Sequence, residues 1–328
     1  MRSYRNLAQV IASEGFVGLA KRFRPVNEAK PSFSPKPVSE IKEDFHRLAS
    51  EFFARAEKMG RADLKDYYWY HTVDLGNGLI TPGTYDYREV LDEFQFPKDM
   101  KGMSVLDVGS ATGFFAFEFE RRGAEVTSLE LPSIADLDRF PGATFEQTAQ
   151  NLDNILKGLE TYTADQLTRL KSKTETECYE LLMDGPFRFC HQTLNSTVKR
   201  HYSRLYDLTP DIGTFDLVFM GDVLCHTINP LLALSKVAPL CRDTLIIAQD
   251  TGPYQDTPVF HYVGGDHAVD TVAWWVPNNP ALEQILKKMG FAEVRVAGQN
   301  VGQYRPLGET FTRTIIHATK QPGQQTLA

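Results

Sequence analysis

The stretch SVLDVGSATGFFAF (residues 104–117) ends a short apolar run with an acid and follows it with small residues at alternate positions. Gly109, Ala111 and Gly113 would let the backbone approach a ligand closely, beside the carboxylate of Asp107. The dinucleotide fingerprint G-x-G-x-x-G needs a third glycine where this chain has Phe114, and no lysine follows as in a phosphate-binding loop. We therefore expect the loop to hold a ligand other than a pyrophosphate.

Other polar side chains could bind a metal or an acceptor. Asp222 and Asp250 follow predicted strands, where metal ligation or a cap or turn role is open. The stretch HYVGGDHAVDTVAWW offers further ligand-type residues, namely His261, Asp266, His267 and Asp270. Residues of this kind more often form a polar pocket wall, so we expect no bound metal. Trp274 and Trp275 could stack on a planar acceptor or pack at a sheet edge.

Composition excludes several classes of protein. The chain has 328 residues, 42% of them hydrophobic, and a formal charge of −7, which argues against a generally basic nucleic-acid surface. Its four cysteines form no C-x-x-C pair, so neither a disulfide framework nor a structural zinc site is indicated. No apolar run approaches the roughly 20 residues of a membrane helix. We expect a cytoplasmic protein without a membrane span.

The elements that must position these residues begin at Ser104, where strand and helix patterns alternate. Candidate strands are 104–108, 125–130, 198–202, 215–220, 243–249, 291–297 and 312–318, and candidate helices include 113–122, 229–240 and 279–289. This alternation predicts an α/β fold, a doubly wound and largely parallel sheet with helices on both faces. Its ligands should lie at the carboxyl ends of the central strands.

Three regions depart from this alternation. Residues 1–60 predict an N-terminal helical extension, with a basic first helix, a proline-rich linker at 27–37 and a second helix at 38–60. The first helix could pack on its own domain or lie on a membrane or nucleic acid. The polar helical stretch 140–185 exceeds what one crossover needs, so we interpret it as an inserted lid or an oligomer contact. The domain itself is expected over 61–320, before a tail at 321–328.

The pattern D-x-G-x-x-x-G resembles the first motif of class I S-adenosylmethionine-dependent methyltransferases. This resemblance implies a Rossmann-like seven-stranded methyltransferase sheet, with S-adenosyl-L-methionine as cofactor at Asp107 and the loop 109–113. It also implies that Glu130, at the end of the second predicted strand, binds the ribose hydroxyls and that Asp207 accepts from the adenine amino group. Gly221, at the end of the fourth predicted strand, completes the expected cofactor contacts.

A narrower resemblance covers residues 65–318. The segments WYHTVDLGNGLITPGTYDYR, FDLVFMGDVLCHTINPLLAL and WWVPNNPALEQILKKMGFAEVRV look like the tRNA wobble-uridine (5-hydroxyuridine) methyl- and carboxymethyltransferase family. Members that use a carboxylated cofactor have a lysine in the first segment and a tyrosine in an L-Y-H sequence. This chain has TYDYR and LCH at those places, with Cys225 in the second. A buried carboxylate needs a cation or several donors, so we expect ordinary S-adenosylmethionine.

Methyl transfer needs an aligned acceptor and a group to remove its proton. His226 follows the fourth predicted strand, and a histidine pKa near ~6.5 suits that role. Alternatively, His226 caps the next helix or stacks on the cofactor. His71 could touch the acceptor or close the aromatic segment 67–70. We expect Tyr70, His261, His267, Trp274 and Trp275 to contact the acceptor.

Three functions follow from these observations. The leading prediction is O-methylation, or less readily N-methylation, of a small molecule or saccharide by a protein that could form a homo-oligomer. The second is modification of a tRNA wobble uridine, with Lys199, Arg200 and Arg204 as phosphate contacts. The third is a non-catalytic cofactor-binding subunit that stabilises a partner.

Overall fold

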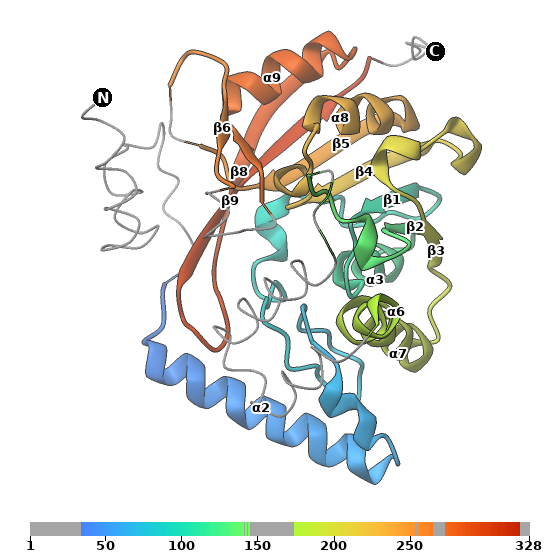
Figure 1. The fold of residues 1–328 in the computed structure, drawn as a ribbon, viewed down its shortest axis with the longest axis vertical. Coiled ribbons are helices and arrows are strands. Elements are labelled where there is room, and N and C mark those ends of the chain that lie inside the picture. The colour runs from blue at the N-terminus through green and yellow to red at the C-terminus, as the bar shows by residue number, and fades with distance from the viewer. Residues whose placement is uncertain are drawn as a thin grey trace.

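The protein is described from a computed structural model, in which residues 34–140, 142, 144, 174–252, 255–264 and 273–321 are described. The predicted first helix, most of the predicted insertion and the tail lie outside these residues. Figure 1 shows a central sheet with helices on both sides and a long N-terminal helix beyond one of its ends.

The main sheet has seven strands in the order β3-β2-β1-β4-β5-β9-β8. The strands are β1 (Ser104–Val108), β2 (Glu125–Glu130), β3 (Lys199–Tyr202), β4 (Phe215–Gly221), β5 (Cys241–Gln249), β8 (Glu293–Gln303) and β9 (Thr310–Thr319). The first five pair in parallel, whereas β9 runs antiparallel to both β5 and β8. The predicted α/β fold with a Rossmann-like methyltransferase sheet is confirmed. The chain reverses its order between β1 and β4, which is where such sheets bind ligands.

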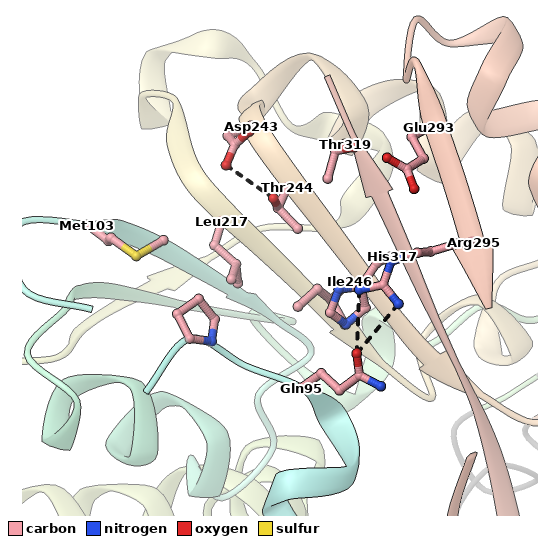
Figure 2. A pocket seen from close by; sticks show the side chains of 11 residues that line it. Gln95, Met103, Leu217, Asp243, Thr244, Ile246, Glu293, Arg295, His317 and Thr319 are labelled. Atoms are coloured by element: carbon pink, nitrogen blue, oxygen red, sulfur yellow. Dashed lines mark hydrogen bonds between the residues drawn. The ribbon is translucent and has the colours of Figure 1, made fainter. Parts of the chain in front are cut away.

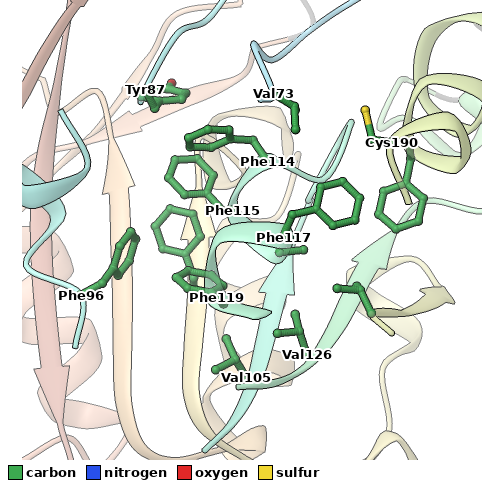
Figure 3. Packing of buried hydrophobic residues seen from close by; sticks show 14 of the residues in the cluster. Val73, Tyr87, Phe96, Val105, Phe114, Phe115, Phe117, Phe119, Val126 and Cys190 are labelled. Carbon is green, nitrogen blue, oxygen red and sulfur yellow. The ribbon is translucent and has the colours of Figure 1, made fainter. Parts of the chain in front are cut away.

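Helices cover the two faces of the sheet and build its two larger apolar cores. On one face lie α3 (Phe114–Arg121), α6 (Glu175–Tyr179) and α7 (Gly185–Leu194), and on the other lie α8 (Pro230–Val237) and α9 (Asn279–Lys288). The first core is rich in aromatic rings. Figure 3 shows four phenylalanines of α3 between Val73 and Tyr87 on one side and the strand residues Val105 and Val126 on the other, namely Phe114, Phe115, Phe117 and Phe119.

The second predicted N-terminal helix is α2 (Val38–Lys58), and it packs on the domain through one apolar face. Ile41, Phe45, Phe52 and Ala56 are buried on this face. The ring of Phe52 lies 4.9 Å from that of Trp69, centroid to centroid, in an edge-on contact. Two hydrogen bonds between Gln303 and the backbone of Lys36 join the start of the helix to strand β8. The spacing of apolar residues thus positions α2 against the aromatic segment.

The structure describes only the two ends of the crossover from β2 to β3. Within the stretch predicted to be a lid, residues 175–185 form α6 and a π-helical turn (Glu180–Asp184) that leads into α7. Cys178, Tyr179 and Leu182 are buried against Tyr68 and Ile134. The π turn shifts the helical repeat, so the apolar face does not show as a regular period in the sequence. The end of the predicted insertion thus packs against the aromatic segment and the chain after β2.

Two shorter elements complete the fold. β6 (Phe260–Tyr262) and β7 (Trp275–Pro277) form a separate antiparallel ribbon, which the sequence did not predict. Across the parts of the chain that the structure describes, no helix is long and apolar enough to cross a membrane.

Candidate active site

The loop after β1 adopts backbone conformations that demand small residues. Gly109, Ala111 and Gly113 have φ values of +69°, +47° and +89°. A Cβ at Gly109 would lie 2.6 Å from Cγ2 of Val223, and one at Gly113 would lie 2.7 Å from the rings of Phe117 and Phe187. Glycine is therefore required at both ends of the loop, whereas the middle position tolerates one methyl group. The contact with Val223 also places the loop directly beside the chain that follows β4.

Glu130 lies at the end of β2, next to this loop. Its Oε2 accepts a hydrogen bond from the backbone N–H of Ala111 at 2.8 Å, and its Oε1 accepts one from Leu131 at 2.9 Å. The side chain is 9% exposed. Because β1 and β2 are parallel neighbours, the sheet brings this carboxylate to the same edge as the loop. Each oxygen keeps a lone pair that a ligand hydroxyl can use.

Asp107 is the second carboxylate at this edge, and it is 1% exposed. Burial, followed by the negative charge of Glu130, raises the pKa of Asp107 to about 7, although Arg200 and a backbone N–H of Ala116 act the other way. Its Oδ2 is buried without a hydrogen-bond partner. A buried polar atom without a partner costs free energy, and a ligand with a donor group would remove that cost.

Arg200 on β3 is hydrogen-bonded to two residues of the loop. Its Nη1 donates to Ser110 Oγ at 2.7 Å, Ser128 Oγ at 3.0 Å and the carbonyl of Ala111 at 3.1 Å. Its guanidinium lies 4.1 Å from the ring centroid of Phe187, and its side chain is 8% exposed. The guanidinium of Arg200 is thus buried and hydrogen-bonded within the protein. It is not the exposed phosphate contact that the sequence suggested.

His71 contacts the loop through Thr112. It is 5% exposed, and its Nδ1 lies 3.2 Å from Oγ1 of Thr112. The rings of Tyr70, Tyr87 and Phe114 lie within 6 Å of the imidazole, centroid to centroid. Burial lowers the pKa of His71 to about 3, so the ring is neutral at neutral pH and accepts a proton poorly. Its contacts favour a positioning role over that of a base.

The turn after β4 carries His226, and Trp274 and Trp275 are hydrogen-bonded to residues next to it. His226 ends a short 3-10 turn (Leu224–His226) and is half-buried. The backbone N–H of Trp274 donates to the carbonyl of Cys225 at 2.6 Å, and the indole of Trp275 donates to the carbonyl of Ile228 at 3.0 Å. These bonds fix the β6–β7 ribbon to the turn that carries His226.

The tryptophans also meet the chain after β2. The ring of Trp274 makes an edge-on contact with Phe140, with 4.9 Å between centroids, and its Nε1 is buried without a partner. Phe140 itself is 63% exposed. An aromatic surface of this kind suits contact with a planar or ring-shaped ligand.

The remaining predicted site residues are more dispersed. Gly221 is the last residue of β4. Asp207 is exposed after β3 and lines an open pocket of about 380 Å³ with Thr127 and Lys199. His261 lies on β6 opposite Val276. His267 lies outside the described residues, and the roles predicted for these side chains stay predictions.

Sequence reasoning missed an ion pair at the carboxyl ends of β4 and β5. Arg313 on β9 donates from Nε to Oδ2 of Asp222 at 2.6 Å and from Nη2 to the hydroxyl of Tyr304 at 3.3 Å. Asp222 has a positive φ of +52°, which is uncommon for a residue with a side chain. Because 91 residues separate the partners, no local motif could have indicated this pair.

A small cavity of about 160 Å³ lies at the other end of the sheet. It is bordered by residues near the amino ends of β4 and β5, with Asp243, Arg295 and His317 among its polar side chains (Figure 2). Arg295 is hydrogen-bonded to Gln95 there. This cavity is remote from the glycine loop. Within the described ranges, no group of three or more His, Cys, Asp or Glu side chains could hold a metal ion.

Comparison with solved structures gives distant likenesses. The chain resembles magnesium protoporphyrin IX methyltransferase from Synechocystis PCC 6803 with bound SAH, at 13% identity and a TM-score of 0.40, over 97% of this chain and 100% of that one. It resembles the N-terminal domain of EvdMO1 in the presence of SAH and D-fucose, at 14% identity and a TM-score of 0.46, over 81% and 97%.

A third likeness is to a 1,6-didemethyltoxoflavin-N1-methyltransferase from Burkholderia thailandensis, at 12% identity and a TM-score of 0.40, over 91% and 99% of the two chains. No curated protein matches the sequence. A family model does match: residues 83–296, well over half of the chain, match the model described as a methyltransferase domain. The chain belongs to this methyltransferase domain family.

Proposed function

We propose that the protein transfers a methyl group from S-adenosylmethionine to an oxygen of a small-molecule or saccharide acceptor. The observation that carries this proposal is the pairing of the glycine loop with two buried carboxylates at the point where the strand order reverses. The orphaned Oδ2 of Asp107 fits a donor such as the cofactor amino group, and Glu130 fits the ribose hydroxyls. The residues present thus suit this cofactor.

The protein's part in the reaction is to orient the acceptor and take its proton. When bound, S-adenosylmethionine would supply a methyl group activated by its positively charged sulfur, for transfer to the acceptor oxygen. His226, in the turn after β4, receives the acceptor proton. His71 stays neutral and holds Thr112 of the loop in place.

Charge and burial favour a small acceptor over tRNA. The chain has a formal charge of −7, and Arg200, one of the three basic residues suggested as phosphate contacts, is enclosed by the loop and Phe187. A nucleic-acid partner needs exposed cations along its backbone, because phosphate contacts supply most of the affinity. We therefore rank the tRNA wobble uridine second, as the alternative acceptor.

The first experiment is calorimetric titration with S-adenosylmethionine, S-adenosylhomocysteine and the carboxylated cofactor. We expect micromolar binding of the first two and no preference for the third. Preference for the carboxylated form would overturn the proposal in favour of the tRNA reaction. Binding without turnover on any extract would favour the non-catalytic subunit instead.

The proposed base gives a sharper test. We expect His226→Asn to lower turnover by a factor of about 10² or more, because a positioned general base contributes on this scale. Affinity for S-adenosylhomocysteine should change less than twofold. His46→Asn, at an exposed position on α2, is the matched control. Unchanged turnover in the His226 variant would remove this residue from the mechanism.

A further inference from the structure

Three tyrosines and the Asp222–Arg313 pair form one continuous surface, which we call the tyrosine wall. Tyr70 stacks on Tyr85 with 4.6 Å between ring centroids, and Tyr85 meets the edge of Tyr304 at 5.1 Å. The hydroxyl of Tyr304 accepts from Arg313, which in turn donates to Asp222. Segments from the aromatic stretch, β4 and the β8–β9 hairpin thus meet in one cluster.

The tyrosine wall adjoins the proposed cofactor loop. Tyr70 contacts the ring of His71 at 4.7 Å, and His71 reaches Thr112 of the loop at 3.2 Å. At the other end, Asp222 directly follows β4, and its backbone N–H donates to Ala248 of β5 at 2.8 Å. The wall therefore spans the carboxyl ends of β1, β4 and β5, which is where an acceptor must lie.

Each member of the tyrosine wall keeps some exposed surface. Tyr70, Tyr85, Tyr304, Asp222 and Arg313 are all half-buried. The side chains of Arg313 and Asp222 are 12% and 17% exposed. An ion pair in surroundings of low dielectric constant can form strong, charge-assisted hydrogen bonds with a ligand. Arg313 supplies the donors and Asp222 the acceptors.

The charges in this cluster select against an anionic ligand. Asp222 already neutralises Arg313. Asp250 lies near both: burial raises its pKa, Arg313 lowers it and Asp222 raises it, with a net rise. A carboxylate or phosphate would have to displace Asp222 from the guanidinium. A hydroxyl group instead fits the pair as it stands, because it can accept from Arg313 and donate to Asp222 together.

We propose that Asp222 and Arg313 bind neighbouring hydroxyl groups of a neutral sugar ring, whose apolar face rests on Tyr70, while Tyr85 backs the Tyr70 ring from its other side. This inference rests on the proposed function and narrows its acceptor to a neutral glycosyl unit. The Arg313 Nη atoms bond to Tyr304 and to the carbonyl of Thr312, so the guanidinium is held in a fixed orientation. Tyr304 thereby acts as a positioning residue for Arg313.

The test uses the full chain with S-adenosylhomocysteine bound and a panel of methyl glycosides as probes. The panel contains neutral hexopyranosides and their deoxy analogues, a uronic acid glycoside and an amino sugar glycoside, with binding followed by saturation-transfer NMR. We expect binding of neutral glycosides that have adjacent free hydroxyls, and weaker binding when either hydroxyl is removed. Preference for the uronic acid or the amino sugar, or no binding of any neutral glycoside, would overturn the inference.

Variants separate binding from folding. Asp222→Asn should weaken binding of the neutral glycoside about tenfold or more, on the scale of a lost charge-assisted hydrogen bond. Tyr304→Phe keeps the ring and should weaken glycoside binding by a smaller factor. This second variant tests the proposal even if Asp222→Asn does not fold. Asp92→Asn, at an exposed position, is the control. Unchanged glycoside affinity in both wall variants would contradict the proposal.

Calorimetric titration with S-adenosylhomocysteine separates failure of the proposed function from failure of the sugar assignment. If S-adenosylhomocysteine itself fails to bind the parent protein, the proposed function is wrong. If it binds with micromolar affinity while the neutral glycosides do not, only the sugar assignment fails.

Discussion

A carboxyl group as enclosed as that of Asp107 destabilises the folded protein at neutral pH. Its pKa is raised to about 7 from an ordinary value of 3.8, mainly by burial and then by Glu130. The folded chain therefore binds this proton between about pH 4 and pH 7, where the unfolded chain has released it. The free energy of unfolding falls as the pH rises through this window and stays lowered above it.

Substitution of Asp107 by asparagine should reveal this effect. We expect Asp107→Asn to change the melting temperature little at pH 4 relative to the parent, and to raise it by a few degrees at pH 8. The underlying difference is on the order of 4 kcal/mol. Cofactor affinity should fall at the same time. Thermal melts across the pH range check this, and a constant offset between the two proteins would argue against a buried ionisation.

At the scale of elements, β3 and the π turn before α7 act together on the glycine loop. The turn ends at Asp184, whose Oδ1 lies 3.3 Å from Nη2 of Arg200. Asp184 also accepts from the hydroxyl of Tyr202 at 2.9 Å. The crossover helix therefore fixes an arginine of the edge strand, and that arginine fixes the loop.

Replacement of Arg200 by lysine should loosen this arrangement. A lysine keeps the charge but loses the fork of donors and the stacking on Phe187. We expect Arg200→Lys to lower cofactor affinity about tenfold and to lower the free energy of unfolding by about 2 kcal/mol. Lys98→Gln, at an exposed position away from the loop, should change neither quantity. Calorimetry and urea unfolding measure both, and equal behaviour of the two variants would show that Arg200 does not support the loop.

Local patterns predicted the strands well because each has a short apolar run beside a helical repeat. The glycine loop could be predicted for the same reason, since its residues are adjacent in the chain. Arg200 could not, because KRHY looks like an exposed edge strand and its partners Asp184 and Phe187 come from the preceding helix. The β6–β7 ribbon has strands of only three residues, too short to show alternation. The domain bounds and the roles of the site residues stay predictions.

At the scale of the whole molecule, α2 completes the aromatic core from outside the sheet. Phe52 is 1% exposed and meets the rings of Trp69 and Phe189, whereas the adjacent Phe53 is only partly buried. Trp69 and Phe189 belong to segments more than a hundred residues apart in the chain. The helix therefore joins the aromatic stretch to the crossover helix α7.

Truncation of these two phenylalanines should separate their contributions. We expect Phe52→Ala to lower the free energy of unfolding by about 3–5 kcal/mol, as for other fully buried rings. Phe53→Ala, on the same helix, should cost less than half as much. Urea titration followed by circular dichroism measures both values. Equal losses would mean that α2 is held by its outer contacts instead.

The tryptophans lie in two separate regions of this protein, and their fluorescence can report on each region. The chain has three, of which Trp69 lies in the aromatic core while Trp274 and Trp275 border the turn that carries His226. Indole emission depends on the polarity of its immediate surroundings. A Trp69→Phe variant would therefore fluoresce from the ligand side alone, and a variant with phenylalanine at both other positions would report only the melting of the core.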